Sequence, residues 1–201
     1  MRRLLIAVPS GDYMHTEFVK SLTKLLRKLD RDGVDYELAI ESGSLVYLAR
    51  DKLACRAINE GFDYVLWLDS DMVFTEDLLE DLQFSGEDFV TGIAVGRRPN
   101  YCSCLFEDIE PEHITRIETW PREPFQVAAC GFACVLILTE ILRGVFMTNK
   151  TCFLPTNDYG EDVAFCKRAT DLGFKIWAEP AVKVGHVGHI TIYPDDREKL
   201  I

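Results

Sequence analysis

Two aspartates spaced two residues apart are the clearest candidates for chemistry in this sequence. Asp69 and Asp71 come directly after the apolar run of residues 64–68. In an extended chain, residues i and i+2 project to the same side, so both carboxylates can face one site. Paired carboxylate oxygens suit Mg²⁺ or Mn²⁺, which also coordinates phosphate oxygens. The pair therefore predicts a divalent cation that binds a phosphate-containing ligand, with a simple turn at a strand end as the alternative.

A second acidic pair, Glu161 and Asp162, follows Gly160 at the start of a predicted helix. The partial positive charge of a helix N-terminus stabilises ionised carboxylates. A carboxylate held in this form can accept a proton from an attacking hydroxyl group, so the pair is a candidate general base. Capping of the helix without any chemistry is the alternative.

Two histidines, His186 and His189, lie beside Gly188 near the end of the chain. An imidazole nitrogen is a common metal ligand. We expect His186, rather than His189, to add a ligand to the metal site, with a purely structural hydrogen bond as the alternative.

A sheet must position these side chains, and the first half of the chain predicts a parallel one. Apolar runs predict buried strands, and they alternate with amphipathic helices. Such alternation predicts parallel strands with right-handed crossovers and ligands at the carboxyl ends of the strands. The predicted strands are residues 4–8, 35–40, 64–68 and 89–95, and the predicted helices are residues 16–29, 45–60 and a short segment near 76–83.

The second half of the chain follows a different pattern. Residues 97–124 are rich in Pro, Glu, Cys and aromatic residues, and residues 125–138 predict one or two strands broken at Gly131. Residues 175–178 and 182–187 predict a pair of strands. We expect a single α/β domain over residues 1–201, in which a mixed-sheet lobe is attached without a linker.

Composition limits the classes of partner. The 201 residues carry a formal net charge of −11, which opposes binding to a nucleic-acid backbone. An anionic small molecule remains compatible if a metal or local basic residues offset the repulsion. The candidate basic residues are Arg50, Lys52, Arg97 and Arg98.

The seven cysteines are an odd number and favour reduced thiols. Cys102 with Cys104, and Cys130 with Cys134, could form a zinc site, but their apolar surroundings favour small buried side chains. No apolar stretch approaches the roughly 20 residues of a transmembrane helix. We therefore expect a cytoplasmic protein.

Taken together, the order and separation of these motifs resemble GT-A glycosyltransferases, especially family 2-like enzymes. The resemblance rests on Asp69-Ser70-Asp71 after an apolar strand, Glu161-Asp162 opening a helix and the downstream His186, and it extends from the first strand to about His189. It implies a GT-A fold with a Rossmann-like, mostly parallel sheet and a mixed-sheet acceptor lobe. Residues 1–96 would bind the nucleotide-sugar, and residues 97–201 would supply the acceptor and catalytic half.

The resemblance also implies a role for individual residues. Asp69, Asp71 and His186 would hold Mn²⁺ or Mg²⁺ against the diphosphate of a UDP or GDP sugar, with Asp69 near the ribose or a metal-bound water. Asp162 would be the general base of an inverting transfer to a hydroxyl acceptor, and Glu161 would position the acceptor. The remaining donor contacts would be Pro9 and Ser10 near the nucleoside, Glu41 near the base or ribose, and Arg50 on the diphosphate, unless Arg50 is only a surface residue of its helix.

Three other functions remain open. In a haloacid-dehalogenase-type phosphatase, Asp69 would be the nucleophile and Asp71 the acid and base, but that motif usually opens the chain. A sugar-phosphate nucleotidyltransferase would need a Gly-rich basic loop after Val8, where this chain has Pro9-Ser10-Gly11. A catalytically inactive nucleotide-binding domain of the same fold is the third.

Overall fold

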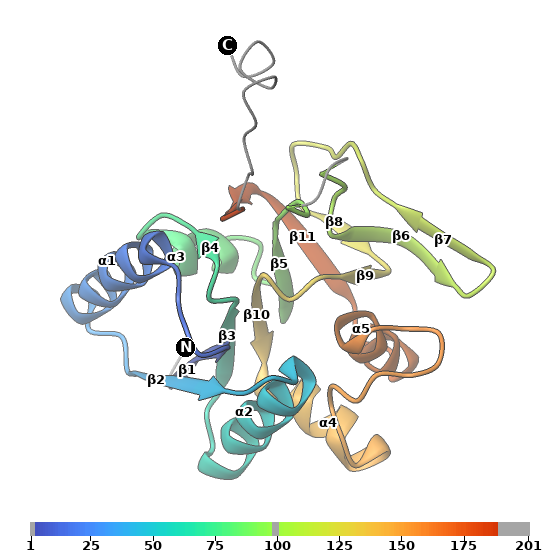
Figure 1. The fold of residues 1–201 in the computed structure, drawn as a ribbon, viewed down its shortest axis with the longest axis horizontal. Helices are drawn as coiled ribbons and strands as arrows, with labels where there is room; N and C mark the ends of the chain where they lie inside the picture. The colour runs from blue at the N-terminus through green and yellow to red at the C-terminus, as the bar shows by residue number, and fades with distance from the viewer. Residues whose placement is uncertain (1–2, 98–100, 189–201) are drawn as a thin grey trace.

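The apolar runs of the sequence form the central strands of one seven-stranded sheet. The computed structural model describes residues 3–97 and 101–188. The strand order is β2-β1-β3-β10-β5-β11-β8 (Figure 1). The strands of this sheet are β1 (Leu4–Ser10), β2 (Tyr36–Ser42), β3 (Tyr64–Leu68), β5 (Phe89–Ile93), β8 (Phe125–Val127), β10 (Cys134–Leu138) and β11 (Ile176–Lys183).

Most of these strands run in the same direction. β1 is parallel to β2 and β3, and β11 is parallel to β5. β10 is antiparallel to both β3 and β5, so β3 and β5 share one direction. β8 is antiparallel to β11 at one edge. The prediction of an α/β fold with a mostly parallel sheet is confirmed.

Helices cover both faces of the sheet because alternate side chains of each strand point to opposite faces. Leu4, Ile6 and Val8 of β1 pack with α1 and α3, whereas Leu5 and Ala7 pack on the face covered by α2, α4 and α5 (Figure 1). Gly33 and Gly61 end α1 and α2 in the left-handed conformation, with φ of 69° and 72°. The helices are α1 (Thr16–Asp32), α2 (Val46–Glu60), α3 (Leu78–Gln83), α4 (Thr139–Asn149) and α5 (Glu161–Asp171).

The second half departs from the sequence prediction in several places. A three-stranded antiparallel sheet is formed by β6 (Leu105–Glu110), β7 (His113–Arg116) and β9 (Ala129–Cys130), and neither β6 nor β7 was predicted as a strand. Helix α4 was also not predicted. The predicted strand pair over residues 175–178 and 182–187 is wrong, because β11 runs unbroken through Pro180 with a shift of register against β5.

Two short strands connect the two halves of the chain. β4 (Met72–Val73) pairs with β12 (Gly185–His186), and this pairing sets His186 opposite Met72. Both halves also contribute strands to the seven-stranded sheet. Within the described residues, no helix is both long and apolar enough to cross a membrane.

Candidate functional site

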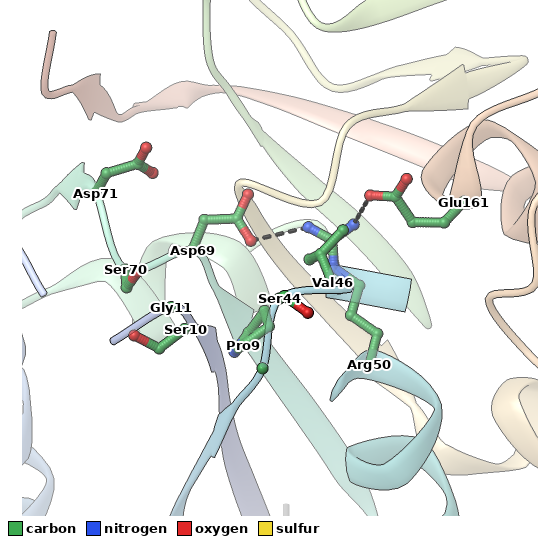
Figure 2. A pocket seen from close by; sticks show the side chains of 11 residues that line it. Pro9, Ser10, Gly11, Ser44, Val46, Arg50, Asp69, Ser70, Asp71 and Glu161 are labelled. Atoms are coloured by element: carbon green, nitrogen blue, oxygen red, sulfur yellow. Dashed lines mark hydrogen bonds and ion pairs between the residues drawn. The ribbon is translucent and has the colours of Figure 1, made fainter. Parts of the chain in front are cut away.

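A cavity of about 450 Å³ lies at the carboxyl ends of β1, β2 and β3, beside the first turn of α2 (Figure 2). This is the edge where ligands bind in open parallel sheets. The lining residues come from the ends of these strands, from α2 and from the start of α5. They are Pro9, Ser10, Gly11, Gly43, Ser44, Val46, Arg50, Asp69, Ser70, Asp71 and Glu161.

Arg50 joins the two acidic motifs across this cavity. Its Nη2 donates to Oδ1 of Asp69 at 2.8 Å, and its Nη1 donates to Oε1 of Glu161 at 2.7 Å. Figure 2 shows both carboxylates turned toward the guanidinium from opposite sides. Arg50 is only 3% exposed, so the interpretation of this residue as a surface position of its helix is wrong. Residues 92 positions apart thereby belong to one site.

Burial and charge act against each other around Arg50. Burial raises the pKa of Asp69, and the nearby guanidinium of Arg50 offsets part of this increase. Burial alone would lower the pKa of Arg50, but attraction to Asp69, Glu161 and Asp162 outweighs it and raises the pKa. Arg50 is therefore a permanent cation whose charge is already balanced by carboxylates.

Asp71 points away from Arg50 and faces His186 and Arg97. The backbone N–H of Val187 donates to the carbonyl oxygen of Asp71 at 2.9 Å, which fixes the β12 end beside the Asp71 loop. Oδ2 of Asp71 lies 3.2 Å from Nε2 of His186. The same Oδ2 accepts a hydrogen bond from Nη1 of Arg97 at 2.6 Å.

The tautomer of His186 follows from its second contact. Nδ1 lies 3.0 Å from the carbonyl oxygen of Val95, which can only accept a hydrogen bond, so Nδ1 carries a proton. Nε2 is then the ring nitrogen that faces the carboxylate of Asp71, and the guanidinium of Arg97 partly offsets the charge of that carboxylate from the same oxygen. An imidazole nitrogen and a carboxylate oxygen are both ligand types that divalent cations accept.

The three predicted metal ligands are only partly brought together. Asp71 and His186 converge, whereas Oδ1 of Asp69 is held by Arg50. Among residues 3–97 and 101–188, no three His, Cys, Asp or Glu side chains form a ready metal cluster. The alternative ligand His189, like Arg98, lies outside the described residues. Metal binding therefore stays a prediction.

The two acids of α5 differ in their contacts. Glu161 lines the cavity and binds Arg50. Asp162 accepts the backbone N–H of Val163 at 2.8 Å, so it satisfies one of the free donors of the first turn. Gly131 lies beside it, since a Cβ atom there would come within 3.7 Å of Oδ2 of Asp162. Asp162 does not line the cavity, although its charge acts on Arg50 and Asp69.

Only some of the residues predicted to contact the sugar donor line the cavity. Pro9 and Ser10 line the cavity, whereas Glu41 does not and instead accepts a hydrogen bond from Lys52 at 2.5 Å. Sequence reasoning missed the lining segment of Gly43, Ser44 and Val46. Small residues that follow a predicted strand were the available signal for this segment. The pairing of Arg97 with Asp71 had no such signal, because it depends on a loop from another strand.

Comparisons with known proteins support the fold. No protein-family model and no curated protein matched the sequence. The catalytic domain of Drosophila β1,4-galactosyltransferase 7 in complex with xylobiose matches with a TM-score of 0.58 and 13% identity, covering 100% of this chain and 80% of its own. GalNAc-T7 with UDP, GalNAc and Mn²⁺ matches with a TM-score of 0.57 and 13% identity, covering 94% of this chain and 44% of its own.

A third structure, the inositol-1-phosphate CTP transferase from T. maritima, has a TM-score of 0.54 and 12% identity, and covers 98% of this chain and 94% of its own. At these identities the similarity shows the fold alone. The chain thus has the GT-A-like fold of nucleotide-diphospho-sugar transferases, as the order of its motifs predicted. Glycosyltransferases and a nucleotidyltransferase share this fold.

Proposed function

We propose that this protein transfers a glycosyl group from a nucleoside diphosphate sugar to a hydroxyl acceptor, with a divalent cation bound at Asp71 and His186. One observation carries the proposal. Buried Arg50 connects Asp69, at the end of β3, with Glu161, at the start of α5, across a single cavity. The shared fold with GalNAc-T7, whose structure contains UDP and Mn²⁺, supports this assignment.

In this proposal, Asp71 and His186 would hold the cation, and Asp69 would lie near its water or the ribose. The bound Mn²⁺ or Mg²⁺ would neutralise the charge that develops on the departing diphosphate. Pro9, Ser10, Gly43, Ser44 and Val46 line the part of the cavity that would accept the nucleoside. A contact of Glu41 with the base or ribose stays a prediction.

Asp162 is the proposed general base, and Glu161 is the proposed positioning residue. The acceptor oxygen would attack the anomeric carbon while the bond from that carbon to the diphosphate breaks, and the acceptor proton would pass to Asp162. This route inverts the configuration. Arg50 fixes the carboxylate of Glu161, which leaves Asp162 as the acid of the pair with no direct ion pair to an arginine among the described residues.

Nucleotidyl transfer is the second candidate, because the T. maritima CTP transferase has the same fold. Such an enzyme would release pyrophosphate from a nucleoside triphosphate rather than a nucleoside diphosphate from a sugar donor. The loop after β1, Pro9-Ser10-Gly11, lacks the Gly-rich basic sequence expected for triphosphate binding. This loop favours glycosyl transfer.

Calorimetric titration of UDP and GDP, with and without Mn²⁺, tests the proposal. We expect binding that requires Mn²⁺ and falls at least about 10-fold in Asp71→Ala and in His186→Ala, the loss expected for a removed ligand or its support. Asp77→Ala is the matched control, because the Asp77 side chain is 57% exposed in the turn before α3.

Product analysis separates the competing reactions. Release of UDP or GDP from sugar donors supports glycosyl transfer, and pyrophosphate release from CTP with a sugar phosphate supports nucleotidyl transfer. Phosphate release from a simple monoester would support the phosphatase. Nucleotide binding that is indifferent to both Mn²⁺ and Asp71→Ala would contradict the proposed site.

A further inference from the structure

The cavity has few positive charges for a ligand as anionic as a nucleoside diphosphate. Its lining includes Asp69, Asp71 and Glu161, and Arg50 is the only basic residue among the lining residues within the described chain. Both Nη atoms of Arg50 are already bound to carboxylates, and the side chain is 4% exposed. A diphosphate at this site therefore needs a cation other than Arg50.

Among the described residues, Arg97 is a basic residue that already contacts the rim of the cavity, at Asp71. Its Nη1 lies 2.6 Å from Oδ2 of Asp71, and its side chain is 50% exposed. The preceding backbone is anchored, because Val95 pairs with Ser103 and the N–H of Gly96 donates to the carbonyl oxygen of Cys102 at 2.8 Å. A long, exposed side chain thus extends from a fixed backbone toward Asp71.

Arg97 and a metal ion cannot use Asp71 in the same way at the same time. Oδ2 of Asp71 binds Arg97 and is also the atom that faces Nε2 of His186. A divalent cation bound between Asp71 and His186 would repel the guanidinium and take over its oxygen. An ion pair with a half-exposed arginine contributes little to stability. Breaking the contact between Arg97 and Asp71 therefore costs little, and a new contact of Arg97 with phosphate oxygens can offset this cost.

We propose that Arg97 is a diphosphate-binding residue that changes its partner when the donor binds. In the absence of the cation, it neutralises Asp71; when cation and nucleotide are bound, it pairs with the diphosphate that shares the cation with Asp71. A guanidinium suits this role because it can donate two parallel hydrogen bonds to phosphate oxygens. The inference rests on the proposed function, since it takes the diphosphate and the cation from there.

Two titrations of the full chain test this exchange. MnCl₂ alone is titrated first, and UDP or GDP is then titrated at saturating Mn²⁺, with wild type, Arg97→Gln and Arg97→Lys. For Arg97→Gln we expect roughly 3- to 10-fold tighter Mn²⁺ binding, because a competing cation is removed. We also expect roughly 10- to 100-fold weaker nucleotide binding, because charge-assisted hydrogen bonds are lost. Both affinities of Arg97→Lys should lie between those of wild type and Arg97→Gln, because lysine keeps the positive charge.

Lys20→Gln is the matched control, since it also removes one positive charge from an exposed side chain, on α1. It should leave both affinities within about twofold of wild type, because exposed charges far from a site are screened. Circular dichroism and the melting temperature verify that each variant is folded. Should Arg97→Gln unfold, the same two affinities are compared between wild type and Arg97→Lys, and opposite changes again support the exchange.

The outcomes distinguish this inference from the proposed function. Opposite changes in the two affinities support the exchange. If Mn²⁺-dependent nucleotide binding occurs but Arg97→Gln leaves it unchanged, or weakens both affinities together, the inference is wrong while the proposed function stands. If wild type binds no Mn²⁺ and no nucleotide, both are wrong.

Discussion

The two halves of this molecule are built differently, and the candidate site lies where they meet. From β1 to β3, strands and helices alternate, and the strands that follow β1 along the chain are its two neighbours in the sheet. In the second half, β10 inserts between β3 and β5, and β11 pairs with β5 and β8. The Arg50–Glu161 ion pair and the Asp71–His186 contact each take one residue from each half. The site thus depends on long-range docking rather than on either half alone.

Helix α2 and an aromatic cluster hold the halves together. Trp67 of β3 packs edge-on against Phe153 and Phe132, at ring-centroid distances of 5.2 and 6.0 Å. Phe153 stacks on Phe165 of α5 at 4.7 Å. On α2, Arg50 and its neighbour Asp51 both bind second-half residues. Weakening these contacts one at a time tests how far the halves depend on each other.

Phe132→Ala should have the largest effect. The ring is 2% exposed and contacts the rings of Trp67, Phe89, Phe153 and Phe165. Its removal leaves a cavity between the halves and should lower the free energy of unfolding by about 3–5 kcal/mol. Urea denaturation measures this loss. Phe84→Ala is the control, because that ring is 84% exposed, and an equal loss in both variants would refute the role of the cluster.

Arg50→Met should have the next largest effect. It leaves the carboxylates of Asp69 and Glu161 without their cation, and breaking a fully buried pair costs roughly 3–5 kcal/mol. We expect about 2–3 kcal/mol here, because the two acidic side chains are 30% and 22% exposed and water can partly solvate them. Urea denaturation again gives the value.

Two further variants sharpen the Arg50 prediction. Arg56→Met changes an arginine of the same helix whose side chain is 35% exposed, and it should cost only about 0.5 kcal/mol. Adding Glu161→Gln to Arg50→Met should recover part of the loss, because one uncompensated charge is removed. A double variant as unstable as the sum of the single variants would show that the ion pair is not the link.

Among the contacts between the two halves, that of Asp51 should have the smallest effect when it is weakened, by Asp51→Asn. Oδ1 of Asp51 accepts the backbone N–H groups of Cys152 and Phe153, each at 2.8 Å, and Oδ2 accepts the hydroxyl of Thr151 at 2.5 Å. Asparagine keeps one acceptor but loses the charge, so we expect a loss of about 1 kcal/mol. Asp158→Asn, at an exposed position of the same loop, should change nothing measurable in the same denaturation experiment. Equal stability of the two variants would argue against this anchor.

The fold of the first half could be predicted from the sequence more completely than that of the second half. The strands of the first half were identified because their residues are buried on both faces and form continuous apolar runs, such as residues 4–8 and 64–68. β6 was missed because only some of its residues face the core, and Glu107 and Glu110 face solvent. β11 was divided in two because Pro180 removes a backbone donor, a loss that the register shift against β5 accommodates.

The site was predictable where chemistry is local. Asp69 and Asp71 follow a buried strand, and Glu161 and Asp162 start a helix, so a short stretch of sequence indicates each pair. Arg50 was ambiguous, because the burial of one helical arginine depends on what packs over it. Arg97 was identified only as one of several basic residues, because its contact with Asp71 spans 26 positions and requires both loops to be in place.

The position of β10 also constrains the order in which the sheet is completed during synthesis. All five residues of β5 are buried, yet its two sheet neighbours, β10 and β11, begin only at Cys134 and Ile176, well after β5 ends at Ile93. A ribosome adds about 5–20 residues per second, so several seconds pass between the synthesis of β5 and that of β10, its first neighbour in the sheet. During that interval β1, β2 and β3 can already pair, while the open edge of β3 and the whole of β5 are exposed to chaperones and to other nascent chains.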